Sequence, residues 1–399
     1  MNELLRYPSF IRFWCARLPA IAGTQMLMLA IGWHMYELTG RAWDLGLVGL
    51  CQFGPALVMT LAAGHVADRV HRARLVALCI AVQAGIAAVL AAATMLQTET
   101  RWLLLVMSML LGGLRPFQMS AQQALVPTLV PKSLLSRATA LSSSGQQIAV
   151  IGGPALGGLL FTGGVNTVYL SCVALFGVAS LLCLSVRYDH VPAPREPVTL
   201  HTLLAGARFI GGNRLLLGAV LLDMFAVLLG GATALLPIFA KEILHVGPEG
   251  LGLLRSAPAV GALLVGVTLA RYPLARGVGR KLLLSVAGFG ACIVVFGLSA
   301  SFLLSLAALA CSGACDMVSV VIRQTLVQLE TPDPMRGRVA AINSLFIGAS
   351  GQLGEFESGF TAAALGPVGS VVMGGVGTLL VALAWAWLFK PLAAREHLR

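Results

Sequence analysis

Residues 305–330, SLAALACSGACDMVSVVIRQTLVQLE, form an apolar run that carries Asp316 near its middle. A helix needs about 20 apolar residues to cross the hydrocarbon core of a bilayer, and this run is long enough. A charged side chain at the centre of such a helix costs about 2.5–3.5 kcal/mol on insertion scales. The run therefore predicts a membrane-spanning helix, and Asp316 predicts a functional or ion-paired position within it.

Similar apolar runs recur along the whole chain. Of its 399 residues, 58% are hydrophobic and only 11% are charged, whereas about 25% are charged in soluble proteins. The period-two alternation of membrane barrel strands is absent, so we expect an all-α polytopic membrane protein. About twelve spans are expected, at 10–38, 43–66, 74–96, 102–129, 137–162, 166–186, 214–240, 249–270, 281–299, 302–328, 337–364 and 368–389.

Lys and Arg residues are distributed unevenly between the two sides of these spans. With the N-terminus in the cytoplasm, twenty fall on the cytoplasmic side and three, Arg41, Arg101 and Lys241, on the outer side. This bias predicts a cell inner (plasma) membrane protein with both termini cytoplasmic. The first run follows basic residues, as a signal peptide does, but it is long and lacks a small-residue cleavage site, so we expect an uncleaved span. The net charge of +11 is explained by loops that face anionic lipid and needs no nucleic-acid partner.

One long hydrophilic segment, 187–213, divides the expected spans into six and six. Two six-helix bundles are therefore expected, at 1–186 and 214–399. Prolines near the start of the segment mark a stiff cytoplasmic linker. Four residues after them fit one face of a short amphipathic helix at the membrane interface: Leu200, Leu203, Leu204 and Ala207.

The two bundles show a weak internal sequence repeat, and buried charges occupy corresponding positions in it. These positions pair each acid with a base: Asp316 with Arg115, and Asp223 with Arg17. We expect the charges to compensate one another in a central cavity, with the two acids as proton carriers and the two bases near the substrate. Structural ion pairs that hold the two bundles together are the alternative.

Other polar residues within the spans are weaker candidates. Three glutamines are expected to face the substrate cavity, although hydrogen bonds between helices are an equally ordinary role: Gln25, Gln118 and Gln122. Three charged residues lie in the outer parts of their spans. An ion pair at an outer gate and packing of protonated glutamate side chains are both open interpretations for them: Arg255, Glu355 and Glu357.

The loop after the second span has the sequence GHVADRVHRAR, residues 64–74. It resembles the signature loop of the major facilitator superfamily, in which a glycine is followed by Asp-Arg and further basic residues, and it departs from that pattern at His71 and Ala73. Parallel six-helix repeats with a midplane substrate site are the architecture of these transporters. The resemblance implies the major facilitator fold and a cytoplasmic gate at four residues: Gly64, Asp68, Arg69 and Arg72.

The fifth span contains GQQIAVIGGPALGGLL, residues 145–160. Proline kinks a membrane helix, and glycines allow close contact with a neighbouring helix. The pattern looks like the antiporter motif of exporters in the superfamily. Residues 136–160, 230–244 and 337–359 also resemble the drug:proton antiporter branch that includes the enterobactin exporter and macrolide-efflux proteins. The motif residues are Gly145, Gly153, Pro154, Gly157 and Gly158.

The resemblance implies a proton-coupled secondary active efflux transporter, working by alternating access. Its expected substrate is a small amphipathic molecule, so siderophore export or multidrug resistance is expected. An exporter or flippase of a lipid-like amphiphile, or an importer, is the alternative. An enzyme is not expected, because the seven His are scattered and no nucleophile–base set or metal cluster stands out. We expect no cofactor or metal, protons as the energy source, lipid as the surroundings and a monomer.

Overall fold

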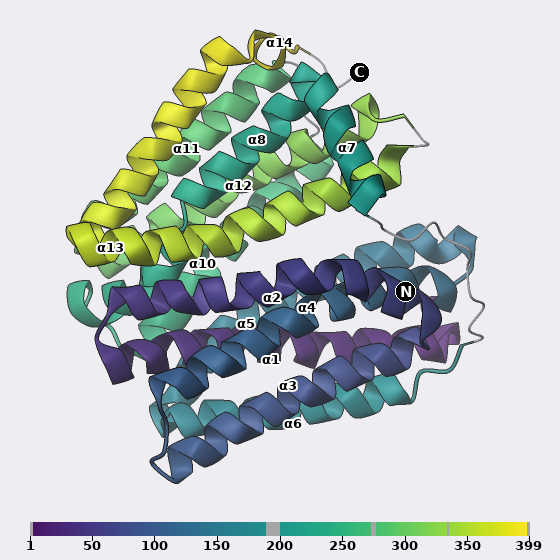
Figure 1. The fold of residues 1–399 in the computed structure, drawn as a ribbon, viewed down its shortest axis with the longest axis vertical. Helices are drawn as coiled ribbons and strands as arrows, with labels where there is room; N and C mark the ends of the chain where they lie inside the picture. Colours follow the sequence, from purple (N-terminus) through teal and green to yellow (C-terminus); the bar gives the residue numbers. More distant parts are fainter. Residues whose placement is uncertain (1–2, 189–199, 273–276, 333–334, 397–399) are drawn as a thin grey trace. The chain divides into compact units, whose positions relative to one another are not determined.

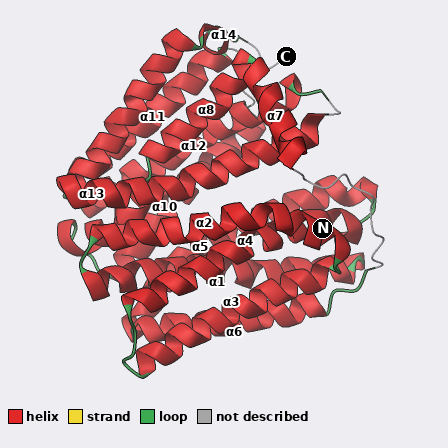
Figure 2. Ribbon diagram, in the orientation of Figure 1, coloured by secondary structure: helices red, strands yellow, loops and turns green. Residues whose placement is uncertain are grey.

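The computed structural model describes residues 3–188, 200–272, 277–332 and 335–396 (Figure 1). All regular secondary structure within these residues is helical (Figure 2). The sequence-based expectation of an all-α polytopic protein is confirmed by this helix content and by the membrane-length helices described below.

The helices before residue 189 follow the first six expected spans closely. In chain order they are η1 (Leu4–Arg6), α1 (Pro8–Thr39), α2 (Ala42–Arg69), α3 (Arg72–Met95), α4 (Arg101–Leu129), η2 (Lys132–Leu134), α5 (Leu135–Leu160), η3 (Phe161–Gly163) and α6 (Val165–Leu184). The helices after residue 199 are α7 (Leu200–Gly212), α8 (Arg214–Leu229), η4 (Ala232–Leu235), α9 (Leu236–Ile238), η5 (Phe239–Ile243), α10 (Pro248–Arg271), α11 (Val278–Leu298), α12 (Phe302–Glu330), α13 (Arg336–Leu388) and α14 (Lys390–Ala393).

Ten helical segments of the described chain are long and apolar enough to cross a membrane. The glycine-, serine- and glutamine-containing α5 is not among these ten, although it has 26 residues. The 53-residue α13 contains the last two expected spans. Gly366 interrupts it with φ 77° and ψ 163°, and Pro367 follows. A left-handed φ is accessible to glycine at little cost, so the chain turns sharply here between two spans.

The chain packs as two compact units. The first comprises Met1–Gly40, Cys51–Pro197 and Gly247–Ser256, and the second comprises Arg41–Leu50, Val198–Val246 and Ala257–Arg399. The first residues of α2 therefore pack with the second unit, and the first residues of α10 pack with the first unit. The expected linker falls partly on residues 189–199, which lie outside the described residues, and the predicted domain boundaries stay a prediction.

In the first unit, α3 and α6 lie side by side, and α6 also packs along α1 (Figure 1). Aromatic side chains fill this core, because Phe10, Phe13 and Phe176 are fully buried. The ring of Phe176 lies against Gly23, where a methyl group would come within 3.0 Å of it. Small residues on one helix thus make room for large apolar residues on the next, as in other membrane helix pairs.

The second unit has a core of apolar side chains from α8, α11, α12, α13 and α14, including Leu222, Leu282 and Ile322. The short helix α7 packs on a smaller cluster that contains Ile210 and Val339. On α7, Ala207 contacts this cluster and Leu204 is exposed. The side chains of residues 200–203, which carry the rest of the expected amphipathic face, lie outside the described residues.

The seventh expected span is interrupted within the second unit. Helix α8 ends at Leu229, after which Gly230 and Gly231 lead into η4, α9 and the π-helical η5. A methyl group at Gly230 would overlap the Phe289 ring, and one at Gly231 would lie 2.7 Å from the backbone of Gly354. The two glycines therefore let the break in the helix sit tightly between α11 and α13.

Candidate functional site

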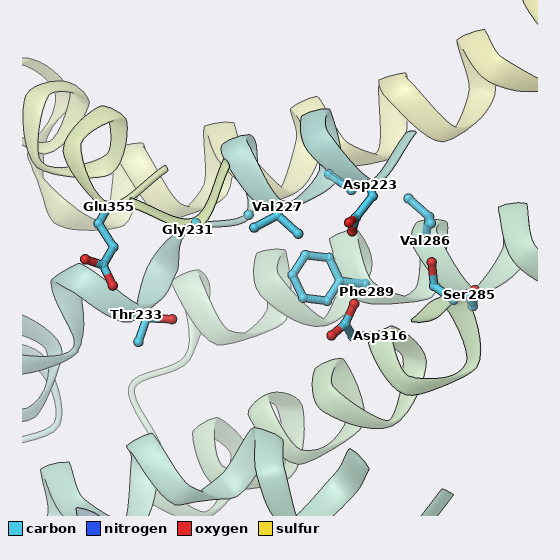
Figure 3. A pocket seen from close by; sticks show the side chains of 13 residues that line it. Asp223, Val227, Gly231, Thr233, Ser285, Val286, Phe289, Asp316 and Glu355 are labelled. Atoms are coloured by element: carbon cyan, nitrogen blue, oxygen red, sulfur yellow. The ribbon is translucent and has the colours of Figure 1, made fainter. Parts of the chain in front are cut away.

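A cavity of about 220 Å³ lies in the second unit beside this helix break (Figure 3). Its walls come from α8, α11, α12 and α13, together with the residues that follow α8. The polar and aromatic side chains that line it are Asp223, Thr233, Ser285, Phe289, Asp316, Ser319 and Glu355. Both acids that the sequence analysis singled out as proton carriers thus line one cavity. Their predicted role remains a prediction.

An ion pair between Asp223 of α8 and Arg323 of α12 compensates one of these acids. Each side chain is only 9% exposed, so the pair is largely withdrawn from solvent. The Nε atom of Arg323 also donates to the backbone oxygen of Ser319 at 3.3 Å and to its Oγ at 3.1 Å. These contacts hold the guanidinium beside a residue that lines the cavity.

Sequence reasoning missed Arg323 and considered only the arginines at repeat-related positions. A signal for it was present, because Arg323 follows Asp316 by seven residues on the same helix. Residues seven apart lie on the same face of a helix, two turns from each other. A long basic side chain on the face that carries a buried acid was therefore readable from the sequence.

Asp316 occupies a different part of the cavity from the ion pair. In Figure 3 the ring of Phe289 lies between the carboxylates of Asp223 and Asp316, and Glu355 lies farther along the cavity. Within the part of the chain that the structure describes, Asp316 takes part in no ion pair. The cavity thus combines a compensated acid with a second acid that faces the same space.

The outer-gate candidates fall in different units. Glu355 packs against α2, since a methyl group at Gly49 would lie 2.8 Å from its Cβ. Glu357 is half-buried, and its backbone oxygen accepts a hydrogen bond from Thr361 at 2.9 Å. Arg255 belongs to the part of α10 that packs with the first unit. A gate formed by these residues stays a prediction.

The substrate-cavity candidates lie in the first unit. Arg17 of α1 donates a hydrogen bond to Gln146 of α5. Gln118 of α4 accepts one from Gln83 of α3 at 2.9 Å. The other three candidates make no side-chain hydrogen bond to another described residue. Gln25 packs against Gly153, Gln122 is half-buried and Arg115 is exposed. Within this unit, Arg17 and Gln118 each contact a glutamine. The expected neutralisation of the Arg17 and Arg115 charges by acids of the other bundle stays a prediction.

The antiporter-motif glycines bring α5 close to two neighbouring helices. Methyl groups at Gly145, Gly153 and Gly157 would lie 2.8–3.2 Å from atoms of α1. At Gly158 a methyl group would lie 2.5 Å from the backbone oxygen of Pro248 in the first turn of α10. One turn farther along α10, a methyl group at Gly252 would approach the backbone oxygen of Pro154 to 2.5 Å. Ser256 of α10 also donates to the backbone oxygen of Ile151 on α5 at 2.7 Å. The motif is therefore a region of close helix packing on both sides of α5.

The signature loop joins α2 to α3. Gly64 is half-buried on α2, and Arg69 is exposed at its end. Arg72 is buried at the start of α3, where its Nη1 donates to the backbone oxygen of Ala124 on α4 at 3.2 Å. Asp68 lies on α2, but its side chain is outside the described residues. Of the four gate candidates, Arg72 makes a defined contact that ties α3 to α4.

Comparison with known proteins agrees with this architecture. Residues 4–397 match the family described as transmembrane secretion effector. The enterobactin exporter EntS of Shigella boydii is 28% identical over 384 residues, which cover 96% of this chain and 92% of that exporter. EntS of Escherichia coli K12 is 27% identical over 402 residues, which cover 100% of this chain and 95% of that exporter.

Solved transporters share the fold at low sequence identity. A variant of the nucleoside transporter NupG superposes with a TM-score of 0.78 and 14% identity, covering 96% of this chain and 100% of that chain. A bacterial homologue of the iron transporter ferroportin superposes with a TM-score of 0.72 and 17% sequence identity, covering 98% of this chain and 100% of that chain. The expected resemblance and the expected fold class are both confirmed. The chain therefore belongs to the transmembrane secretion effector family of the major facilitator superfamily, and it is a multi-pass membrane transporter rather than an enzyme.

Proposed function

We propose that this transporter exports a small amphipathic molecule in exchange for protons. Siderophores and drug-like or macrolide-like compounds are the proposed substrate classes. The antiporter motif on α5 supports export, and the relatives named enterobactin exporter support a siderophore-like substrate. The observation that carries proton coupling is the cavity of the second unit, in which Asp316 faces the same space as the ion pair of Asp223 with Arg323.

The charges around this cavity suit a proton-coupled switch. The ion pair is neutral as a unit, whereas an ionised Asp316 adds a negative charge at membrane depth, which is costly unless it is neutralised. Burial of a carboxylate generally favours its protonated form, and a nearby guanidinium favours its ionised form. A proton taken up by one acid would therefore free Arg323 to approach the other.

The helix geometry allows Arg323 to serve both acids. Side chains on a helix lean toward its N-terminus, and the Nε contacts with Ser319 place the guanidinium one turn in that direction. Asp316 lies three residues before Ser319, so it is about 4.5 Å farther along the helix axis in the same N-terminal direction. In the proposal, Arg323 moves between Asp223 and Asp316 as the transporter changes state.

The remaining predicted residues keep their expected roles as part of this proposal. Arg17, Gln25, Arg115, Gln118 and Gln122 contact the substrate. Gly64, Asp68, Arg69 and Arg72 form a cytoplasmic gate, and Arg255, Glu355 and Glu357 an outer gate. The transporter acts as a monomer in the cell inner membrane, with both termini in the cytoplasm, as the excess of basic residues on one side favours.

Transport into everted membrane vesicles under an imposed pH gradient tests the proposal. Asp316→Asn removes the charge and keeps the side-chain volume, so gradient-driven efflux should be lost while substrate binding stays measurable. Asp316→Glu keeps a carboxylate and should retain part of the activity. Proton-driven efflux that persists in Asp316→Asn would assign this acid to structure.

Comparative profiling of secreted metabolites identifies the substrate. A deletion strain should lose a secreted iron chelator under iron limitation and not under iron repletion if the substrate is a siderophore. Loss of a lipid-like amphiphile in both conditions would favour the lipid exporter instead. Accumulation in the opposite direction in oriented vesicles would show that the protein is an importer.

A further inference from the structure

A second cavity lies in the first unit, where α3 begins and α6 has ended. Its volume is about 490 Å³. Its polar lining includes His71, Arg74, Arg187 and Tyr188, and its apolar lining includes the buried side chains of Cys183 and Val186. Among the described residues that line it, none is acidic. None of these residues belongs to the proposed transport cavity.

Tyr188 organises one wall of this basic pocket. Its hydroxyl accepts a hydrogen bond from the backbone N–H of Arg72 at 2.9 Å, which anchors it to the first turn of α3. Its ring packs on His71 with a centroid distance of 4.5 Å and an interplanar angle of 50°. Burial raises the pKa of the Tyr188 phenol, so the ring adds no negative charge at neutral pH.

The two arginines give the pocket its positive charge. Arg74 and Arg187 are both exposed, so their guanidinium groups lie at the rim rather than in the core. The backbone around Arg187 is held in place, because its carbonyl oxygen accepts a hydrogen bond from Ser9 at 2.6 Å. The Nη1 atom of Arg12 donates to the backbone oxygen of Ser185 at 2.9 Å. The rim is thus attached to the start of α1 as well as to α3 and α6.

An exposed apolar surface continues from the rim along the two helices. On α3, Leu78 lies one turn after Arg74 and is 61% exposed. On α6, Leu184 and Leu181 precede Arg187 and are 57% and 69% exposed. The helices α3 and α6 lie side by side (Figure 1), and these exposed leucines lie near the start of α3 and in the last turn of α6, the ends that carry the arginine rim.

We propose that this basic pocket binds the phosphate of an anionic phospholipid headgroup, with the acyl chains along the exposed leucines of α3 and α6. Guanidinium groups are suited to phosphate oxygens, and basic pockets between membrane helices bind acidic headgroups. A free phosphate would contact only the arginine rim and the wall formed by the rings of Tyr188 and His71. A lipid uses these and the adjoining apolar surface, which favours the lipid as the ligand.

Lipid titration of the purified full-length protein in a neutral detergent tests this proposal. Phosphatidylglycerol should raise the thermal unfolding midpoint and remain bound in native mass spectra, while phosphatidylcholine and inorganic phosphate should do neither. The double variant Arg74→Gln/Arg187→Gln should bind phosphatidylglycerol about 30-fold more weakly, since each basic residue near an anionic lipid contributes about a factor of five.

The matched control removes two charges of the other unit. Arg280 and Lys281 are exposed at the start of α11, as Arg74 is at the start of α3. The variant Arg280→Gln/Lys281→Gln should bind phosphatidylglycerol as the unaltered protein does. Because Arg74 and Arg187 are exposed, their replacement should leave the thermal unfolding midpoint in lipid-free detergent unchanged. If the midpoint of the double variant is lowered, the single variant Arg187→Gln takes its place in the lipid titration.

Three results would overturn the proposal. The first is equal affinity of the double variant and its control for phosphatidylglycerol. The second is a rise of the unfolding midpoint with phosphatidylcholine equal to that with phosphatidylglycerol, and the third is a rise of the midpoint with inorganic phosphate in the absence of lipid. The last result would assign the pocket to a free phosphate. The measurement requires neither substrate nor a proton gradient, so its outcome is independent of the proposed export function.

Discussion

Removing one partner of the Asp223–Arg323 pair should destabilise the protein far more than removing both. Each side chain is 9% exposed, so the pair belongs with buried rather than surface ion pairs. Loss of one partner of a buried pair costs about 3–5 kcal/mol, whereas a surface pair contributes about 0–1 kcal/mol. Arg323→Gln also loses the guanidinium contacts with Ser319, and Asp223→Asn leaves the arginine without its counterion.

A double-mutant cycle measures this effect. The variants Arg323→Gln, Asp223→Asn and their combination are unfolded in mixed micelles, and the free energy of unfolding is compared with that of the unaltered protein. Each single variant leaves one buried charge without its partner, whereas the double variant leaves none, so the double variant should recover at least about 2 kcal/mol relative to the sum of the single variants. Single-variant losses below about 1 kcal/mol that add in the double variant would refute a buried pair.

Three further changes test contacts outside the cavity, each by thermal unfolding. Gly158→Ala should destabilise by about 1–3 kcal/mol, because its methyl group would meet the backbone of α10, whereas Gly152→Ala points into open space and should not; equal effects would contradict close packing at this motif. Ser256→Ala should cost about 1 kcal/mol through its lost hydrogen bond to α5, and no loss would mean that the contact is not made. Tyr188→Phe should cost about 0.5–2 kcal/mol, because it removes the acceptor at the start of α3 and keeps the ring contact with His71; an unchanged midpoint would exclude this capping role.

The membrane spans were predictable because each depends on local hydrophobicity over about 20 residues. The sequence placed separate spans at 337–364 and 368–389, and the sharp turn at Gly366 falls between them. It did not predict the interruption after Leu229. A Gly-Gly pair within an apolar run is compatible with a continuous membrane helix. Here the close approach of Phe289 and Gly354, from helices distant in sequence, accompanies the break.

The charge pairing shows a different limit of sequence reasoning. The repeat argument compared positions that correspond between two bundles, so it considered only Arg17 and Arg115 as partners for the acids. The observed partner of Asp223 comes from α12, a neighbouring helix of its own unit. Sequence correspondence contains no information on which faces of two helices meet, and that contact decides the pairing. The cavity likewise depends on α8, α11, α12 and α13 coming together, which no local pattern records.

The location of Arg323 changes what the acid on α12 requires. If Asp316 needed an arginine from the other bundle, its charge could be compensated only when the two bundles came together. Arg323 lies on the same helix face as Asp316 and is paired with Asp223, so in the proposal it can compensate Asp316 without any such movement. Among Asp223, Asp316 and Arg323, one arginine for two acids leaves one negative charge whenever both acids are ionised. That unmatched charge creates a place for a proton, so the number of charges within one unit, rather than their symmetry across two, is the physical basis of the proposed coupling.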